Sequence, residues 1–133
     1  MLRSNRLADS LESWVKIHIP GAGDPSSIRF HPCDRIPFWW VPGNRHAQGL
    51  TLWRNVYLRR TYWPIYRDRA AIELLFHELI HVEQFQRQPI WFPIKYLLAH
   101  LRYGYHDNPA EEEARTRASQ LTSLFLSDYG AQE

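Results

Sequence analysis

The sequence predicts an α+β domain in which a few short antiparallel strands near the N-terminus are followed by three helices. Three observations lead to this class. The first half of the chain contains short segments of β-forming residues, residues 70–88 contain no Gly or Pro, and residues 110–129 again contain no helix breaker. Strands that precede a run of helices are typical of α+β folds. With 133 residues, the whole chain 1–133 fits a single domain.

The first expected strand is Trp14–Ile19. Its apolar residues alternate with Lys16 and His18, which is the period of a half-buried strand. The next segments are expected to form, in order, a turn-rich loop, a short second strand and an irregular proline-containing stretch: Pro20–Ser27, Ile28–Phe30 and Pro32–Pro42.

Residues 50–59 are predicted to form a β-hairpin. Leu50–Trp53 and Val56–Arg59 are two further strand candidates, and they are joined near Arg54-Asn55. Because Asn tolerates a positive φ, Asn55 is expected to allow a tight turn between them.

Residues 70–88 are predicted to form the first long helix. Asp68 stands where an N-cap belongs, and Pro89 ends the run. A second helix is expected over Pro93–Arg102, because Gly104 breaks the pattern that follows it.

The third helix is expected to open at Asn108-Pro109. Asn is a good N-cap and Pro suits the first helical position. No breaker follows before Gly130, so the helix is expected to be long. At about 100° per residue, one face of this helix is apolar. That face carries Ala110, Ala114, Ala118, Leu121 and Phe125.

The first long helix carries the motif His77-Glu78-Leu79-Ile80-His81, an HExxH motif. Residues i and i+4 share one face of a helix, so both imidazoles can reach one Zn²⁺ ion while Glu78 stands beside them as a general base. The helical angles turn the two histidines away from the main apolar stripe, toward a cleft or solvent. The motif therefore predicts metal-assisted hydrolysis, most simply of a peptide bond.

A catalytic zinc ion usually has three protein ligands and one open position, so a third ligand is needed. The first turn of the third helix supplies Glu111, Glu112 and Glu113. Helical angles place Glu111 at one margin of the apolar face, Glu113 near the other margin and Glu112 toward solvent. Glu111 is therefore the expected ligand, with His100 and His106 as rivals.

Composition and charge narrow the classes of function. With 44% hydrophobic and 14% aromatic residues, the chain belongs with globular proteins. The net charge of +2 is small and the arginines are scattered, so no nucleic-acid partner is expected. Cys33 is the single cysteine, which excludes an intramolecular disulfide; it is expected to be a packed or free thiol rather than a ligand.

No membrane-spanning or secretory segment is expected, and the default location is the cytoplasm. Charged residues interrupt the first twenty positions, so no signal-peptide core is present there. The most apolar stretches, Ile36–Pro42 and Ile90–Leu101, are too short or too interrupted to cross a bilayer. The second of them offers a peripheral membrane contact through Trp91, Phe92 and Leu97.

The motif and its downstream glutamate resemble the gluzincin class of zinc metallopeptidases, whose third ligand is a Glu on a second helix. Glu111 lies 30 positions (111 minus 81) beyond His81. This compact spacing is similar to that of the minigluzincins and of small bacterial HExxH domains of unknown function, including some attached to contractile injection systems. The related pattern ExxA maps onto Glu111 and Ala114. Over residues 50–117, the resemblance implies a minimal zincin-like domain in which His77, His81 and Glu111 hold one zinc ion.

The sequence departs from many of these relatives at Arg115, where an Asp often supports a histidine ligand. Glu73 and Asp107 are the candidates to replace that Asp. The relatives also recruit a Tyr or His from upstream of the ligand to stabilise the oxyanion, which implies Tyr105 or His106 here, with Tyr103 as a further candidate.

The expected function is zinc-dependent cleavage of a peptide or protein substrate. The strand edge within Leu50–Arg59 would bind an extended substrate, and Trp53 or Trp63 would line that groove, although six tryptophans are more simply explained as core. Two alternatives stay open. A non-catalytic, zinc-stabilised interaction module would not require Glu78. A membrane or partner-docking protein would use Ile90–Leu101, and its HExxH motif would be incidental. The oligomeric state is left open.

Overall fold

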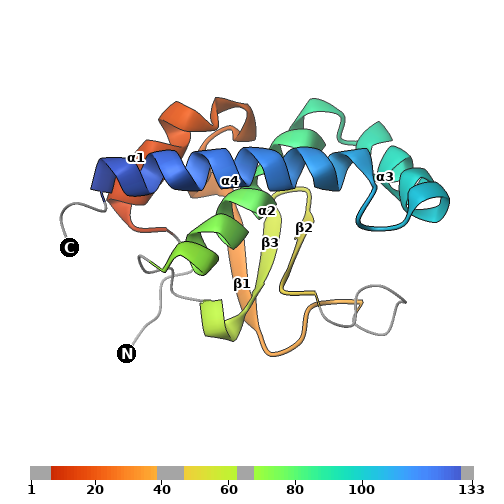
Figure 1. The fold of residues 1–133 in the computed structure, drawn as a ribbon, viewed down its shortest axis with the longest axis horizontal. Helices are drawn as coiled ribbons and strands as arrows, with labels where there is room; N and C mark the ends of the chain where they lie inside the picture. The colour runs from red at the N-terminus through yellow and green to blue at the C-terminus, as the bar shows by residue number, and fades with distance from the viewer. Residues whose placement is uncertain (1–6, 39–46, 63–67, 130–133) are drawn as a thin grey trace.

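The computed structural model describes residues 7–38, 47–62 and 68–129. Within these ranges the chain forms a three-stranded sheet and four α-helices, which confirms the α+β class (Figure 1). In chain order the elements are α1 (Asp9–His18), β1 (Arg29–Cys33), β2 (Gly49–Leu52), β3 (Asn55–Arg59), α2 (Arg69–Arg87), α3 (Trp91–Tyr103) and α4 (Pro109–Tyr129). Short 3₁₀ turns connect some of these elements.

The expected strand Trp14–Ile19 is wrong, because residues 14–18 belong to helix α1 and Ile19 is its C-cap. Leu11, Trp14 and Val15 are the buried residues of α1, and their spacing is that of one helical face. Ile17, which the alternating pattern placed beside Val15, is 72% exposed. Trp14 also donates a hydrogen bond from Nε1 to Asp128 on α4, at 2.9 Å, so a contact across the whole chain stabilises the helix.

The sheet has the order β1-β3-β2. Strands β2 and β3 pair antiparallel, which confirms the hairpin, whereas β1 pairs parallel to β3. The expectation that all the N-terminal strands are antiparallel is therefore wrong for β1. This strand confirms the second expected strand for Arg29 and Phe30, but Ile28 precedes it, and it continues to Cys33, into the stretch expected to be irregular. Pro32 is tolerated there because β1 is an edge strand among the described residues.

The hairpin turn depends on a different residue from the one expected. Trp53, with φ of 58°, takes the positive φ, and Asn55 already pairs within β3. Long-range hydrogen bonds from both Trp53 and Arg54 hold this turn. Trp53 donates from Nε1 to the carbonyl of Pro89 at 2.8 Å, and Arg54 donates to the carbonyls of Ala22 and Asp24 at 2.8 and 2.9 Å. The turn is therefore tied both to the end of α2 and to the loop before β1.

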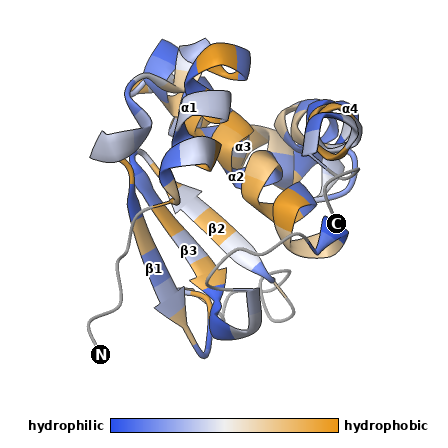
Figure 2. Ribbon diagram, turned by 90° about the vertical axis from the view of Figure 1, so that its left-hand side faces the viewer, coloured by the Kyte–Doolittle hydropathy of each residue, from blue (hydrophilic) through white to orange (hydrophobic). Residues whose placement is uncertain are grey.

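Helix α2 runs between the sheet and α4, so the HExxH segment passes through the centre of the molecule (Figures 1 and 2). Its ends are as predicted: the side chain of Asp68 accepts a hydrogen bond from the backbone of Ala70, and the helix stops before Pro89. The core-facing side chains of α2 are almost completely buried, namely Ile72, Leu75, Phe76, Leu79 and Ile80. Burial of this face supplies most of the packing that fixes α2 against its neighbours.

The predicted start and the predicted buried face of α4 are also confirmed. The Oδ1 atom of Asn108 accepts a hydrogen bond from the backbone of Ala110 at 3.0 Å, and Pro109 is the first helical residue. Ala114 and Ala118 are buried, so their small side chains let α4 approach α2 closely. Helix α3 begins two residues earlier than expected and ends at Gly104, whose φ is 80°. None of the helices in the described ranges has the length and apolar character needed to cross a bilayer.

Candidate metal centre

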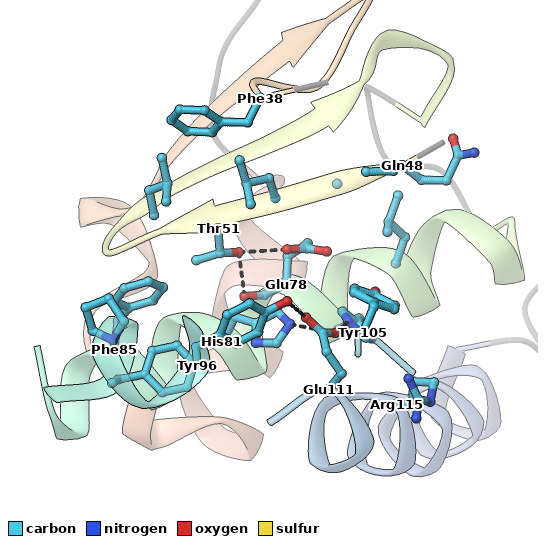
Figure 3. Close-up of a pocket in the computed structure, with 18 of the residues that line it drawn as sticks. Phe38, Gln48, Thr51, Glu78, His81, Phe85, Tyr96, Tyr105, Glu111 and Arg115 are labelled. Carbon is cyan, nitrogen blue, oxygen red and sulfur yellow. Dashed lines mark hydrogen bonds and ion pairs between the residues drawn. The ribbon is translucent and has the colours of Figure 1, made fainter. Parts of the chain in front are cut away.

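Three side chains from α2 and α4 converge on one point. The Nε2 atoms of His77 and His81 lie 2.9 and 3.2 Å from the same carboxylate oxygen, Oε1 of Glu111. The potential ligand atoms of the three residues all lie within 4.8 Å of one another. Among the described residues this is the group that could hold a metal ion, and its members are the three predicted from the sequence. Figure 3 labels two of them, His81 and Glu111.

Glu111 occupies this position because α4 starts just before it. The Asn108 cap fixes the first turn, and Glu111 is only 3% exposed. Burial alone would raise the pKa of Glu111, but hydrogen bonds from His77, His81 and Tyr96 hold it well below its usual range. The hydroxyl of Tyr96 on α3 donates to the second carboxylate oxygen at 2.5 Å. A buried, charged carboxylate thus faces the two imidazoles.

Gln84 orients His81. The Nε2 atom of Gln84 donates to the carbonyl of Ala110 at 3.2 Å and to Glu113 at 2.7 Å, and both of these partners can only accept. The Oε1 atom of Gln84 must therefore be the one that lies 2.7 Å from Nδ1 of His81, so Nδ1 carries a proton. In a neutral His81 the lone pair is then on Nε2, which is the nitrogen that faces Glu111. This is the arrangement that a metal-ligating histidine requires.

The donor set fits a divalent cation. With Nδ1 protonated, the Nε2 lone pair of His81 would meet a carboxylate lone pair of Glu111, unless a proton or a cation lies between them. Burial lowers the pKa of His81, but the hydrogen bond and charge of Glu111, with the charge of Glu78, outweigh it and raise this pKa to about 9. Two imidazoles and one carboxylate form a ligand set typical of catalytic zinc.

Gln84 takes the supporting role that the sequence reasoning gave to Glu73 or Asp107. Glu73 lines the adjacent cleft and pairs with Arg69 at 4.0 Å, and Asp107 is exposed. A signal for Gln84 was present in the sequence, because it lies three positions after His81 and so shares its helical face. Tyr96 carried no such signal, since its contact with Glu111 depends on how α3 packs beside α4.

Glu78 lies beside the cluster without joining it. Its carboxylate accepts a hydrogen bond from the hydroxyl of Thr51 on β2 at 2.8 Å, and its side chain lies toward β2 (Figure 3). Glu78 is 4% exposed, and burial raises its pKa above the ordinary value. A Cβ atom added to Gly49 would come within 2.9 Å of the Glu78 carboxylate, so glycine allows the strand to approach this closely.

The cluster opens into a cleft of about 840 Å³ between β2, α2 and α3. Residues 47–52, which include all of β2, form one wall. The apolar side chains of the lining come from several elements and include Phe38, Leu50, Leu74, Phe85, Phe92 and Leu97. Tyr105 and Arg115 add polar groups near Glu111 (Figure 3). The cleft is therefore mainly apolar and carries its polar groups around the histidines and Glu111, as ligand-binding clefts commonly do.

The structure brings Tyr105 to the cleft but not its rivals. Burial raises the pKa of Tyr105 above its ordinary value, so its hydroxyl keeps its proton near neutral pH. His106 is exposed, Tyr103 is 50% exposed, and neither lines the cleft. His100 stacks on the ring of Tyr96 and also lies outside the ligand group.

The tryptophans were expected to belong to the core, but two of them are exposed. Trp14 is buried, but Trp53 and Trp91 are 47% and 62% exposed. Trp53 packs on Phe85 but does not itself line the cleft, and Trp63 lies outside the described residues. Cys33 is a free thiol, as predicted.

Comparison of the chain with models of known families, with curated proteins and with solved structures finds no match. The relationship to gluzincins therefore stays a prediction from the motifs, and function has to be argued from the site.

Proposed function

We propose that this protein is a zinc-dependent metallopeptidase of the gluzincin type. The observation that carries the proposal is the convergence of His77, His81 and Glu111 at the floor of an open cleft, with Glu78 buried beside them. A purely structural zinc site would be closed by a fourth protein ligand, and among the described residues the ligand group has three members.

The two histidines and Glu111 would hold one zinc ion. When bound in such a site, zinc lowers the pKa of a water molecule to about 7 and polarises a carbonyl group. Gln84 and Tyr96 hold two of the three ligands in place through hydrogen bonds, at 2.7 Å to His81 and 2.5 Å to Glu111. The chain thus fixes the ligands before the metal arrives.

Glu78 is the general base. Its raised pKa, caused by burial, brings it closer to the pH at which it must exchange protons, and Thr51 holds its carboxylate in one orientation. It would take the proton of the attacking water and pass it to the leaving amine. The hydroxyl of Tyr105, which keeps its proton and lies in the cleft, is the candidate donor to the oxyanion.

Strand β2 is the proposed binding site for the substrate backbone. It lies at one edge of the three-stranded sheet in the described part of the chain, and it forms a wall of the cleft above Glu78. An extended peptide could pair with this outer edge, since such pairing needs only backbone groups. The close approach at Gly49 would bring the peptide within reach of Glu78.

The competing function is a non-catalytic, zinc-stabilised interaction module. It needs the three ligands but gives no role to a buried carboxylate held by Thr51 beside an open cleft. Burying Glu78 costs free energy because burial disfavours its charged form. That cost is explained if the group acts as a base, which favours the enzyme.

The test combines metal analysis with digestion of a peptide library. We expect about one zinc ion per chain, hydrolysis by the wild type, and loss of hydrolysis with retained zinc in Glu78→Gln. The matched control is Glu112→Gln, which changes an exposed carboxylate on α4 and should alter neither property. Equal hydrolysis by Glu78→Gln would reject the mechanism. A zinc-loaded wild type without hydrolysis would favour the interaction module, and a chain that takes up no zinc would reject the site.

A further inference from the structure

Helix α3 has a second face that meets the cleft of the proposed peptidase site only through Leu97. Its inner face packs on the molecule through Phe92, which is buried, and through Tyr96. The outer face carries six large apolar side chains that are 44% to 74% exposed: Ile90, Trp91, Ile94, Leu97, Leu98 and Leu101. At about 100° per residue these six fall within one arc of about 120°. Exposed apolar groups gathered in this way mark an interaction surface.

The surroundings of this face are basic. Residues 84–106 contain no Asp or Glu, whereas Lys95 and Arg102 lie within them. Lys95 and Arg102 are both exposed, and the helical angles put both at the margin of the arc next to Trp91 and Leu98. A surface that is apolar in the middle and cationic at its margin complements an apolar layer covered by anionic groups.

The position of α3 suits contact with a flat surface. The helix lies at one end of the molecule, beside the start of α4 (Figure 1). Leu97 lies on this outer face and also lines the cleft, so the two surfaces are continuous.

We propose that the outer face of α3 binds the surface of an anionic lipid bilayer. Trp and Leu on one face with Lys or Arg beside them are typical of helices that lie in the interface plane. A protein partner fits the face less well, because five of its six side chains are Leu or Ile with no polar group, and Leu is under-represented among residues that dominate protein–protein binding. In the sequence-based expectation the contact included Phe92, but Phe92 is buried and does not take part.

The test uses sedimentation of the full chain with vesicles of phosphatidylcholine, with and without phosphatidylglycerol. We expect the protein to sediment with the anionic vesicles. The double variant Leu98→Glu/Leu101→Glu should lower the partition constant by at least about tenfold, because it removes apolar area and adds repelled charges. Lys95→Gln and Arg102→Gln should each lower it by about fivefold on anionic vesicles, with little change on neutral ones.

The matched control is Ile17→Glu, which changes an equally exposed apolar residue on α1 and should leave binding unchanged. Glu78→Gln should also bind normally, so failure of the peptidase proposal would not affect this result. Absence of wild-type binding, or an equal loss in Ile17→Glu, would overturn the proposal. A wild-type dimer in light scattering that Leu98→Glu/Leu101→Glu dissociates would overturn it too, because the face would then be an interface between copies of the chain.

Discussion

Gln84 accepts a hydrogen bond from Nδ1 of His81 at 2.7 Å, and this contact determines which nitrogen of His81 faces Glu111. The amide of Gln84 cannot be reversed without placing its oxygen toward two groups that only accept, the carbonyl of Ala110 and the carboxylate of Glu113. One glutamine therefore couples the HExxH helix to the backbone and to Glu113 of α4.

We expect Gln84→Leu to weaken zinc binding by about 10- to 100-fold, because His81 loses the acceptor that holds its tautomer and ring orientation. The measurement is a competition titration with a chromophoric chelator. Gln120→Leu, an exposed change on α4, is the matched control and should bind zinc as tightly as the wild type does. Wild-type affinity in Gln84→Leu would show that His81 needs no support from this side chain.

The helices could be predicted from the sequence because their ends depend on neighbouring residues. Asp68 and Asn108 cap the residues that follow them directly, and Gly104 and Pro89 stop helices locally. Glu111 was predicted for the same reason, since one helical angle relates it to the buried face of its own helix. Its burial in the structure agrees with that angle.

The errors involve contacts between distant parts of the chain. The segment Trp14–Ile19 fits both a strand pattern and a helix pattern. In the structure Trp14 of helix α1 donates a hydrogen bond to Asp128, which is 114 positions away in the sequence. The parallel pairing of β1 with β3 likewise depends on where the intervening chain crosses, which periodicity does not encode. Tyr96 reaches Glu111 only because α3 and α4 lie side by side.

Zinc affinity should rise with pH up to about 9. The metal needs a neutral imidazole, whereas the raised pKa of about 9 keeps His81 protonated in the metal-free chain below that pH. Zinc uptake therefore displaces one proton from His81. Release of this proton should lower the apparent zinc affinity by about tenfold for each pH unit below about 9. Titrations at several pH values in non-coordinating buffers measure this slope. A flat profile between neutral pH and pH 9 would mean that His81 is already neutral before zinc binds.

Thr51→Val should shift the acidic limb of the pH–rate profile to higher pH. The hydroxyl of Thr51 donates to the Glu78 carboxylate, which lowers the pKa of Glu78 and so partly offsets the effect of burial. Valine keeps the shape but removes this donor, so the charged form becomes less stable and the pKa rises. The profile of kcat/KM on the best library peptide reports the shift. Thr116→Val, an exposed change on α4, should leave the limb where it is, and a matching shift in both variants would assign the limb to another group.

The contact between Glu83 on α2 and Arg117 on α4 should stabilise the fold at neutral pH, and this contribution should be lost at acidic pH. Glu83 is 7% exposed and accepts hydrogen bonds from both Arg87 and Arg117, with Nη2 of Arg117 at 3.0 Å. These partners lower the pKa of Glu83 despite its burial. Its stabilising effect is therefore complete above the ordinary pKa of a glutamate and is lost as the pH falls through the lowered value.

We expect Arg117→Met to lower the free energy of unfolding by about 1–3 kcal/mol at neutral pH, because a largely buried carboxylate loses a charged partner. Urea denaturation at neutral and acidic pH measures the difference, which should shrink in acid as Glu83 becomes protonated. Arg102→Met, at an exposed position on α3, is the control for removing a positive charge. In Glu83→Gln the further effect of Arg117→Met should be smaller than in the wild type; equal effects in both backgrounds would show that the two side chains are not coupled.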